Sequence, residues 1–398
     1  MRPVAPVPTM PGASLRPIAP LPAGIRSRFV DGVNGLRMHV LEAGASGRKR
    51  PLLLLLHGFP ELAYSWRKVM GPLADAGFHV VAPDQRGYGL TSGWDADYDG
   101  DVGSFRMWNI VRDAIGLVHA LGRRQVTAVI GHDFGSLAAA WCALIRPDVF
   151  PALAMMSAPF PGPPELPFDL AEGDDRRSQG AGLFGAIPHE ALASLPRPRK
   201  HYQAYYARRA AATDLRDCPQ GVHAFLRAYF HMKSADWPHN RPVPLRDWSA
   251  EEFARLPEYY VMDLDKNMAE TVAAHMPSEA EIAACRWLPD AELAVYSEAF
   301  RRTGFQGGLN WYRCALEPRY AAELEVFSGR TIDVPSVFIA GAADWGPLQK
   351  PGDLDRMRSS ACTRMLGCHF VPGAGHWVQQ EQPEATVRLL LDFLNRAD

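Results

Sequence analysis

The chain of 398 residues is 47% hydrophobic and 22% charged, a balance that is ordinary for a soluble globular protein. Its formal net charge of -2 provides no basic surface of the kind that binds nucleic acid or an anionic membrane. The longest aliphatic run, Leu52–Leu56, is far too short to cross a bilayer, so we expect neither a nucleic-acid partner nor membrane insertion.

The chain begins with a proline-rich lead-in, Met1–Gly24, which holds seven prolines and lacks the unbroken apolar stretch of a secretory signal. This composition predicts a disordered or extended segment. The six cysteines are scattered and form no Cys-x-x-Cys pair, which argues against a disulfide framework and a structural zinc site. We therefore expect a reduced, cytoplasmic setting and no metal. The cysteines are Cys142, Cys218, Cys285, Cys314, Cys362 and Cys368.

From residue 25 to about residue 160, short apolar runs alternate with longer amphipathic stretches. Each run fits a buried strand and each stretch a helix, which predicts an α/β fold with a mostly parallel sheet covered on both faces. A β-hairpin is expected to precede the parallel strands. The predicted strands are Ile25–Val33, Leu36–Leu41, Pro51–Leu56, His79–Ala82, Val126–Ile130 and Ala152–Met156, and the predicted helices are Ser65–Ala76, Ser104–Leu121 and Ser136–Ile145.

The alternation stops near Pro159, and the chain from Pro161 to about Cys314 is helical in pattern and rich in aromatic residues. The later strands could not form a closed core alone, so we expect one core with an inserted helical cap rather than two independent domains. Such a cap covers a site at the strand ends. The later elements are predicted at Ser336–Ala340, Cys368–Val371 and Pro383–Asn395. The expected regions are a lead-in (1–24), a first core part (25–160), the cap (161–315) and a second core part (316–398).

The pentapeptide Gly131–Gly135, with the sequence Gly-His-Asp-Phe-Gly, directly follows a predicted strand. Small residues at its two ends allow the strand to turn sharply into a helix and to present the central side chain on a strained elbow. Nucleophiles of α/β-hydrolases occupy this position, most often as serine. Here the residue is Asp133. A carboxylate displaces leaving groups at a saturated carbon and forms an alkyl ester, which favours opening an epoxide or displacing a halide.

Two further residues follow later predicted strands. Asp344 lies just past one strand and His376, in Gly-Ala-Gly-His-Trp, lies past the next. The chain order of nucleophile, acid and histidine is that of the α/β-hydrolase triad. We expect His376 to take a proton from the water that attacks the ester, while Asp344 orients the imidazole and stabilises its cationic form.

The tetrapeptide His57-Gly58-Phe59-Pro60 follows the third predicted strand, where the oxyanion hole is expected. The backbone amides of Phe59 and Phe134 would stabilise the charge on the tetrahedral intermediate of ester hydrolysis. The same tetrapeptide also fits a tight turn.

Together these motifs resemble the α/β-hydrolase-fold epoxide hydrolases, of the soluble epoxide hydrolase kind. The match is most specific at the end of the cap, where Tyr296 stands four residues before Phe300, with Thr-Gly-Phe at 303–305 and Leu-Asn-Trp-Tyr-Arg at 309–313. The resemblance implies the α/β-hydrolase fold with an inserted cap and hydrolysis of an epoxide to a vicinal diol without a cofactor. It also implies two cap tyrosines that bind the epoxide oxygen.

By this resemblance Tyr296 is one oxygen-binding tyrosine and Tyr202 is the other. The family usually continues after the second tyrosine with Gln and Pro-Gly, whereas this chain has Ala207–Arg209, so Tyr205 and Tyr206 compete with Tyr202. Phenols suit the task because they donate hydrogen bonds to a forming alkoxide and still tolerate an apolar pocket.

The substrate site is expected to be apolar, with Trp311 and Phe134 at its walls, although aromatic residues also build ordinary cores. Which epoxide is used stays open, as does the choice between monomer and homodimer. The cap aromatics that suggest an apolar substrate are Phe225, Tyr229, Trp237, Trp248 and Trp287.

Two other functions fit part of the pattern. Haloalkane dehalogenases share the Asp nucleophile, but they hold the halide with a Trp after the nucleophile and an Asn in the oxyanion tetrapeptide. Phe134 and Phe59 offer no polar side-chain hydrogen, and Phe134 is not the Arg by which fluoroacetate-type dehalogenases hold a carboxylate. A non-catalytic ligand-binding relative would be expected to lose a catalytic residue, yet all are present. The sequence therefore favours an epoxide hydrolase.

Overall fold

The computed structural model describes residues 21–45, 50–166, 185 and 187–397. Within them, eight strands form one sheet: β1 (Ile25–Val33), β2 (Leu36–Ala43), β3 (Leu52–Leu56), β4 (His79–Pro83), β5 (Ala128–His132), β6 (Leu153–Met156), β9 (Ser336–Gly341) and β10 (Met365–Val371). Their order across the sheet is β1-β2-β4-β3-β5-β6-β9-β10. The β1–β2 hairpin and the β2–β4 pair are antiparallel, and the remaining pairs are parallel. The predicted fold class is confirmed.

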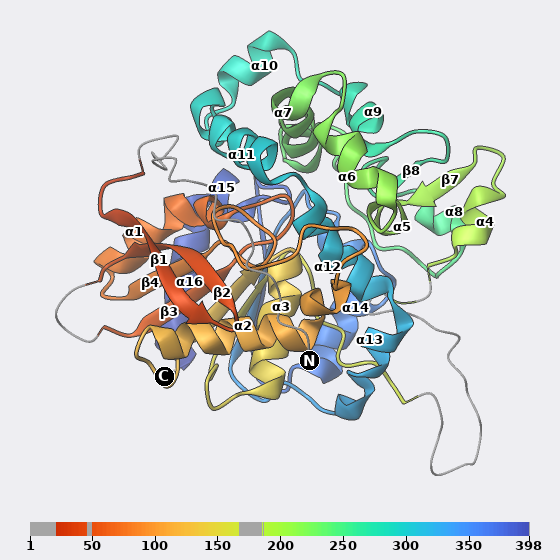
Figure 1. The fold of residues 1–398 in the computed structure, drawn as a ribbon. Coiled ribbons are helices and arrows are strands. Elements are labelled where there is room, and N and C mark those ends of the chain that lie inside the picture. The colour runs from red at the N-terminus through yellow and green to blue at the C-terminus, as the bar shows by residue number, and fades with distance from the viewer. Residues whose placement is uncertain (1–20, 46–49, 167–184, 186, 398) are drawn as a thin grey trace, which may run out of the picture.

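Helices cover both faces of this sheet (Figure 1). On one face α1 (Arg67–Asp75) packs against α16 (Pro383–Ala397), and on the other α2 (Met107–Ala120) packs against α3 (Phe134–Ile145). The buried residues of α16 recur at helical spacing, which gives the helix one apolar face for the sheet. They are Thr386, Val387, Leu390, Phe393 and Leu394.

Strand β3 shows why the sheet forms here. Its five leucines are all buried, and its neighbours on the two sides are β4 and β5, both parallel to it. A central parallel strand is buried on both faces, so its sequence is a continuous apolar run rather than an alternating one. The carboxyl ends of β3, β5, β9 and β10 consequently lie along one edge of the sheet.

The region between β6 and β9 is mainly helical, and its helices lie together above that edge (Figure 1). It also contains a two-stranded antiparallel sheet, β7 with β8, which the helical pattern did not predict because each strand has only three residues. Its elements are α4 (His189–Ala193), β7 (Arg199–His201), α5 (Tyr202–Tyr206), α6 (Arg209–Arg216), α7 (Gly221–Lys233), α8 (Ala250–Phe253), β8 (Val261–Asp263), α9 (Met268–Ala273), α10 (Glu279–Ala284), α11 (Asp290–Thr303), α12 (Gln306–Leu316), α13 (Pro318–Ala322) and η3 (Glu325–Phe327).

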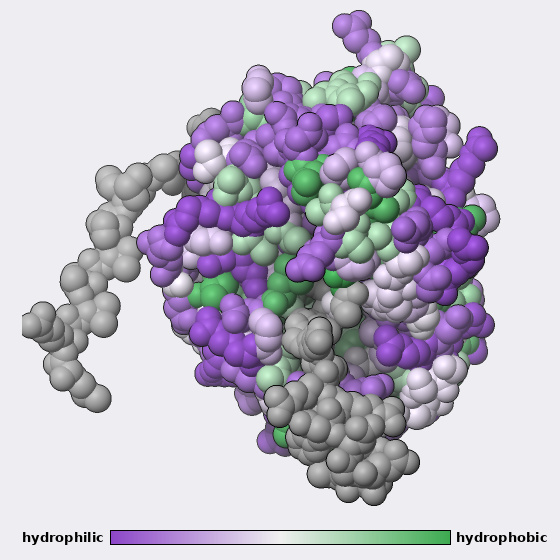
Figure 2. Space-filling model, turned by 90° about the vertical axis from the view of Figure 1, so that its right-hand side faces the viewer, coloured by the Kyte–Doolittle hydropathy of each residue, from purple (hydrophilic) through white to green (hydrophobic). Residues whose placement is uncertain are grey.

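Short helices complete the core: η1 (Ala63–Trp66), η2 (Val102–Phe105), η4 (Gly346–Leu348), α14 (Asp353–Arg356), η5 (Met357–Ala361) and α15 (Val378–Glu381). The predicted lead-in, 1–24, lies mostly outside the described residues. Among the helices that the structure describes, none is long and apolar enough to span a membrane. The face in Figure 2 is largely hydrophilic, with hydrophobic residues gathered near its middle.

Candidate active site

Asp133 stands at the junction between β5 and α3. Its backbone has φ of 55°, a left-handed conformation that non-glycine residues rarely adopt and that is typical of strained functional turns. The flanking glycines allow the turn, because a Cβ at Gly131 would collide with the carbonyl of Gly135, and a Cβ at Gly135 with the carbonyl of Leu56. The structure therefore has the strand-to-helix elbow expected from the pentapeptide.

The structure brings together Asp133, His376 and Asp344, each from a loop after a parallel strand. His376 donates from Nδ1 to Asp344 Oδ1 over 3.1 Å, and its Nε2 lies 3.2 Å from Asp133 Oδ2. The amide of Gly346 also donates to Asp344 Oδ1, over 2.7 Å. The imidazole is thus held between two carboxylates, as the order of the motifs predicted.

Both carboxylates are stabilised in their ionised forms. Burial alone would raise the pKa of Asp133, but the neighbouring His376 imidazole, Lys233 and His132 together hold it well below its usual value. The pKa of Asp344 is lowered in the same way, with burial outweighed by His376 and the Gly346 amide. Asp133 is therefore a carboxylate at neutral pH, which a nucleophile needs.

The amide of Phe59 donates to Asp133 Oδ1 over 3.0 Å. Gly58 permits this approach, since a Cβ at that position would collide with the Asp133 side chain. A backbone N–H already directed at the nucleophile's oxygen is one half of the predicted oxyanion hole. For Phe134, the second half, the structure shows the ring packed against Trp311 and Tyr312, with centroids 5.0 and 5.4 Å apart.

Asp133 lies in the wall of a cavity between the core and the region above it. One side of this cavity is apolar and the other carries polar residues. Tyr202, the first residue of α5, and Tyr312, from α12, both line it. Burial and the nearby Asp133 raise the pKa of both phenols, so that both keep their protons at neutral pH. The apolar wall is formed by Phe134, Leu137, Trp141, Pro159, Phe160 and Pro161, and the polar wall includes Gln203, Gln349, Lys350 and Asp353.

Tyr296 is not among the residues that line this cavity, which corrects its predicted role. Its hydroxyl lies 2.9 Å from Ser65 Oγ, donates to Gln380 Oε1 over 3.1 Å, and accepts from Arg67 over 3.3 Å. These partners occupy the hydroxyl within a separate buried cluster. Tyr296 therefore has a structural position, and the cavity offers Tyr312 in its place.

The assignment of Trp311 to the substrate wall is corrected for a related reason. Its indole N–H donates to the carbonyl of Arg86 over 2.9 Å, and the ring does not line the cavity. Successive residues of a helix point about 100° apart, so Tyr312 faces the cavity when Trp311 faces the core. One sequence signal marks that face: Gly308, one turn before Tyr312, lies where a Cβ would press on the Phe59 ring.

The two competitors of Tyr202 do not line the cavity either. Tyr205 donates its hydroxyl to Asp214 over 2.9 Å, and the ring of Tyr206 packs against Tyr312, with centroids 5.1 Å apart. Of the three tyrosines in α5, Tyr202 is the one whose position fits the prediction.

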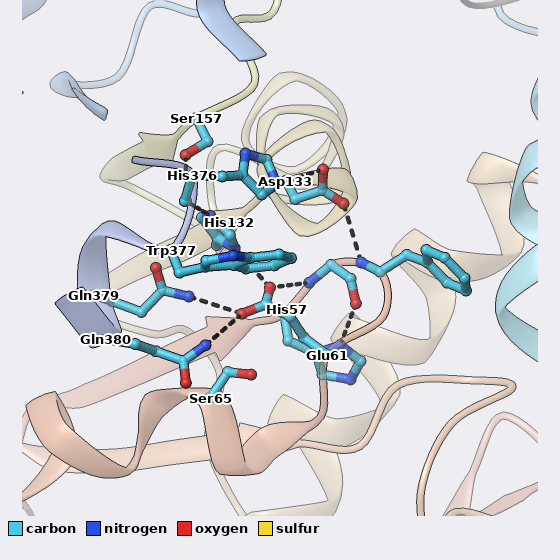
Figure 3. A network of polar contacts seen from close by, with 12 residues as sticks. His57, Glu61, Ser65, His132, Asp133, Ser157, His376, Trp377, Gln379 and Gln380 are labelled. Carbon is cyan, nitrogen blue, oxygen red and sulfur yellow. Dashed lines mark hydrogen bonds and ion pairs between the residues drawn. The ribbon is translucent and has the colours of Figure 1, made fainter. Parts of the chain in front are cut away.

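A buried polar network lies beneath Asp133 and was not predicted (Figure 3). Glu61 Oε2 accepts from the Gly58 amide over 3.0 Å and lies 2.6 Å from His132 Nδ1, while its Oε1 accepts from Gln379 over 2.9 Å. His132 in turn donates from Nε2 to the carbonyl of His376 over 2.7 Å. This network links the oxyanion loop, the elbow and the histidine loop.

Glu61 and His132 form an ion pair with no exposed side-chain surface. Burial opposes both charges, yet Glu61 raises the pKa of His132 and His132 lowers the pKa of Glu61. Within the described ranges, no group of three or more His, Cys, Asp or Glu side chains is placed to hold a metal ion.

Comparison with known proteins supports this description of the site. A family model for the alpha/beta hydrolase fold matches residues 51–217. The chain is 32% identical to epoxide hydrolase A of Mycobacterium tuberculosis, over 92% of this chain and 96% of that protein. It is 30% identical to an epoxide hydrolase of Caballeronia sordidicola, over 92% of each.

Two solved structures are also similar. An epoxide hydrolase from an endophytic Streptomyces has a TM-score of 0.73 at 29% identity, over 94% of this chain and 96% of that one. Potato (Solanum tuberosum) epoxide hydrolase I has a TM-score of 0.69 at 27% identity, over 94% and 99% of the two chains.

Proposed function

The chain belongs to the epoxide hydrolases of the α/β-hydrolase fold, and on this basis we propose that its own residues convert an apolar epoxide and water into a vicinal diol in two steps. The observation that carries the proposal is the position of Asp133. A carboxylate, rather than a hydroxyl, stands on the elbow in front of the His376–Asp344 pair.

In the first step Asp133 attacks a carbon of the epoxide ring. Its Oδ1 is held by the Phe59 amide, which is where the carbonyl oxygen of an ester would have to lie, so Oδ2 is the attacking atom. A bond forms between Oδ2 and the carbon as the ring C–O bond breaks. Tyr202 and Tyr312 donate hydrogen bonds to the oxygen that leaves, and one of them supplies the proton for the new hydroxyl.

In the second step the ester is hydrolysed. His376 takes a proton from water at Nε2, and the resulting hydroxide attacks the carbonyl carbon of the Asp133 ester. The amides of Phe59 and Phe134 stabilise the tetrahedral oxyanion, and Asp344 stabilises the imidazolium. The ester C–O bond then breaks, the diol leaves with the proton, and Asp133 is a carboxylate again. The reaction needs no cofactor.

The cap, residues 161–315, supplies both phenols, so we take it as the lid of the reaction site and not only as a cover. The walls of Phe134, Leu137 and Trp141 support an apolar substrate.

Intact-mass measurement of the His376→Gln variant tests the proposal. Without the base, the protein should gain the mass of one epoxide and keep it, because the ester forms but does not break down. The Asp133→Asn variant is the control and should gain no mass. An unshifted mass of His376→Gln would contradict the covalent route.

We also propose a cytoplasmic location. All six cysteines are unpaired, which is typical of a reducing compartment. Thiol titration of the protein purified from its own cells should count six free thiols, and a lower count that a reductant restores would contradict this location.

A further inference from the structure

The end of the cap helix α7 packs directly against the loop that carries His376. The amide of His376 donates to the carbonyl of Lys233, the last residue of α7, over 2.8 Å. A Cβ at Gly375 would lie 2.5 Å from the carbonyl carbon of Ser234 and 2.6 Å from the carbonyl oxygen of Lys233. The cap and the histidine loop are therefore in backbone contact.

One carboxylate joins these two segments. Glu381, the last residue of α15, accepts at Oε2 from the amides of Ala235 and Gly375, over 2.8 and 2.9 Å. At Oε1 it accepts from the amide of Trp377, over 2.9 Å. The side chain thus holds the amides on both sides of His376 and, in the same grip, the first residues of the cap after α7.

The side chain of Lys233 strengthens the same junction. It is 3% exposed, and its ammonium lies 5.3 Å from the ring centroid of Trp377. Three cap tyrosines complete the enclosure, since Tyr229, Tyr259 and Tyr260 have their centroids 5.5, 5.9 and 5.2 Å from the same nitrogen. Buried cations are stabilised by aromatic faces in this range. Lys233 therefore contacts His376 through its backbone and Trp377 through its charge.

We propose that Glu381 is the positioning residue for His376, and that it fixes the imidazole between Asp344 and Asp133 by clamping the histidine loop to residues 233–235 of the cap. The inference rests on the proposed function, because positioning the base matters only if His376 activates water. The arrangement makes the cap part of the base-positioning structure as well as the source of the phenols.

A step-specific effect distinguishes this role from ordinary stability. Alkylation uses the Asp133 carboxylate and the two tyrosines, whereas ester hydrolysis also needs His376 Nε2 aimed at a water. Each oxygen of Glu381 accepts at least one amide N–H. A glutamine at this position would therefore set N–H against N–H in either orientation, and would release one side of the loop.

The test uses the full chain and single-turnover rapid mixing with styrene oxide, followed by intact-mass detection of the alkylated protein. Glu381→Gln should form the ester at a rate within about twofold of the wild type and hydrolyse it roughly tenfold to a hundredfold more slowly. The matched control is Glu384→Gln, at an exposed position in the first turn of α16, which should leave both rates unchanged.

If Glu381→Gln formed and hydrolysed the ester at wild-type rates, the inference would be wrong while the two-step function stood. A lower ester amplitude with an unchanged hydrolysis rate would also overturn it, because that pattern means fewer folded molecules. An absence of ester in both the wild type and His376→Gln would instead refute the proposed function. Should Glu381→Gln fail to fold, Gly375→Ala perturbs the same junction and must show the same selective loss of hydrolysis for the inference to hold.

Discussion

Tyr202 and Tyr312 contact each other beside the cavity that contains Asp133, with ring centroids 5.9 Å apart and ring planes at 73°. The two rings come from different cap helices, α5 and α12. Their hydroxyls are the phenols that this part of the cap presents to an epoxide bound in front of the nucleophile.

Replacing these tyrosines should slow alkylation selectively. Tyr202→Phe or Tyr312→Phe alone should lower the rate of ester formation by about tenfold to a hundredfold, because one donor to the forming alkoxide is lost. The double variant should have no measurable activity. Stopped-flow or quenched-flow measurement of ester formation gives these rates.

Tyr296→Phe is the matched comparison, since it removes a phenol that lies outside the cavity. Its ester-formation rate should equal that of the wild type. Its unfolding free energy should be lower by about 1–3 kcal/mol, because buried groups on Ser65, Arg67 and Gln380 lose a partner. Loss of alkylation in Tyr296→Phe, with normal rates in the Tyr202 and Tyr312 variants, would restore the original assignment.

The buried ion pair of Glu61 and His132 should contribute to stability beneath the nucleophile. Glu61→Gln leaves His132 without its counter-charge and should lower the free energy of unfolding by about 3–5 kcal/mol, measured by urea denaturation. Asp148→Asn removes an exposed partner of Arg146 and should change it by less than about 1 kcal/mol. Equal effects from the two substitutions would show that the buried pair has no special weight.

Lys350, in the polar wall of the cavity, predicts a pH dependence of substrate binding. Burial lowers the pKa of its amine to about 8, so the positive charge is present below that pH and is lost above it. An apolar epoxide that fills the cavity removes water from the amine, which disfavours the charged form. Binding should therefore tighten by roughly threefold to tenfold as the pH rises from about 7 to 9.

The dissociation constant obtained from the concentration dependence of ester formation measures this effect. In Lys350→Met the constant should be independent of pH over the same range and close to the wild-type value at high pH. The prediction is wrong if wild-type binding weakens on raising the pH, or if the methionine variant keeps the full dependence.

Much of this site could be predicted from the sequence because parallel strands deliver their carboxyl ends to one edge. Asp133, Asp344 and His376 each follow an apolar run, so chain order alone placed them together. Phe59 follows from the same rule. The two glycines of the elbow are explained by backbone contacts that exclude any Cβ.

The cap was harder to predict, because a residue's direction there depends on how each helix is oriented above the core. Trp311 and Tyr312 differ by one position, yet one donates to the carbonyl of Arg86 and the other lines the cavity. Tyr296 stands in an equally distinctive motif, but its helix turns it toward Arg67. No local pattern states which face of a cap helix meets the nucleophile.

The pairing of Glu61 with His132 was missed for a different reason. The two residues are 71 positions apart, and they meet only because β3 and β5 are neighbours in the sheet. Each was visible within a recognised motif, but a buried carboxylate and a buried imidazole can be matched only once the strand order is known.

The central claim is that the Asp133 carboxylate, and not water, forms the first bond to the epoxide carbon. A single turnover in ¹⁸O-labelled water, with enzyme in excess over epoxide, tests it directly. Mass analysis should find the diol without label and the peptide containing Asp133 enriched in it, because the product takes its oxygen from the side chain and water refills that side chain. Label in the diol on the first turnover, with an unlabelled Asp133, would contradict the account.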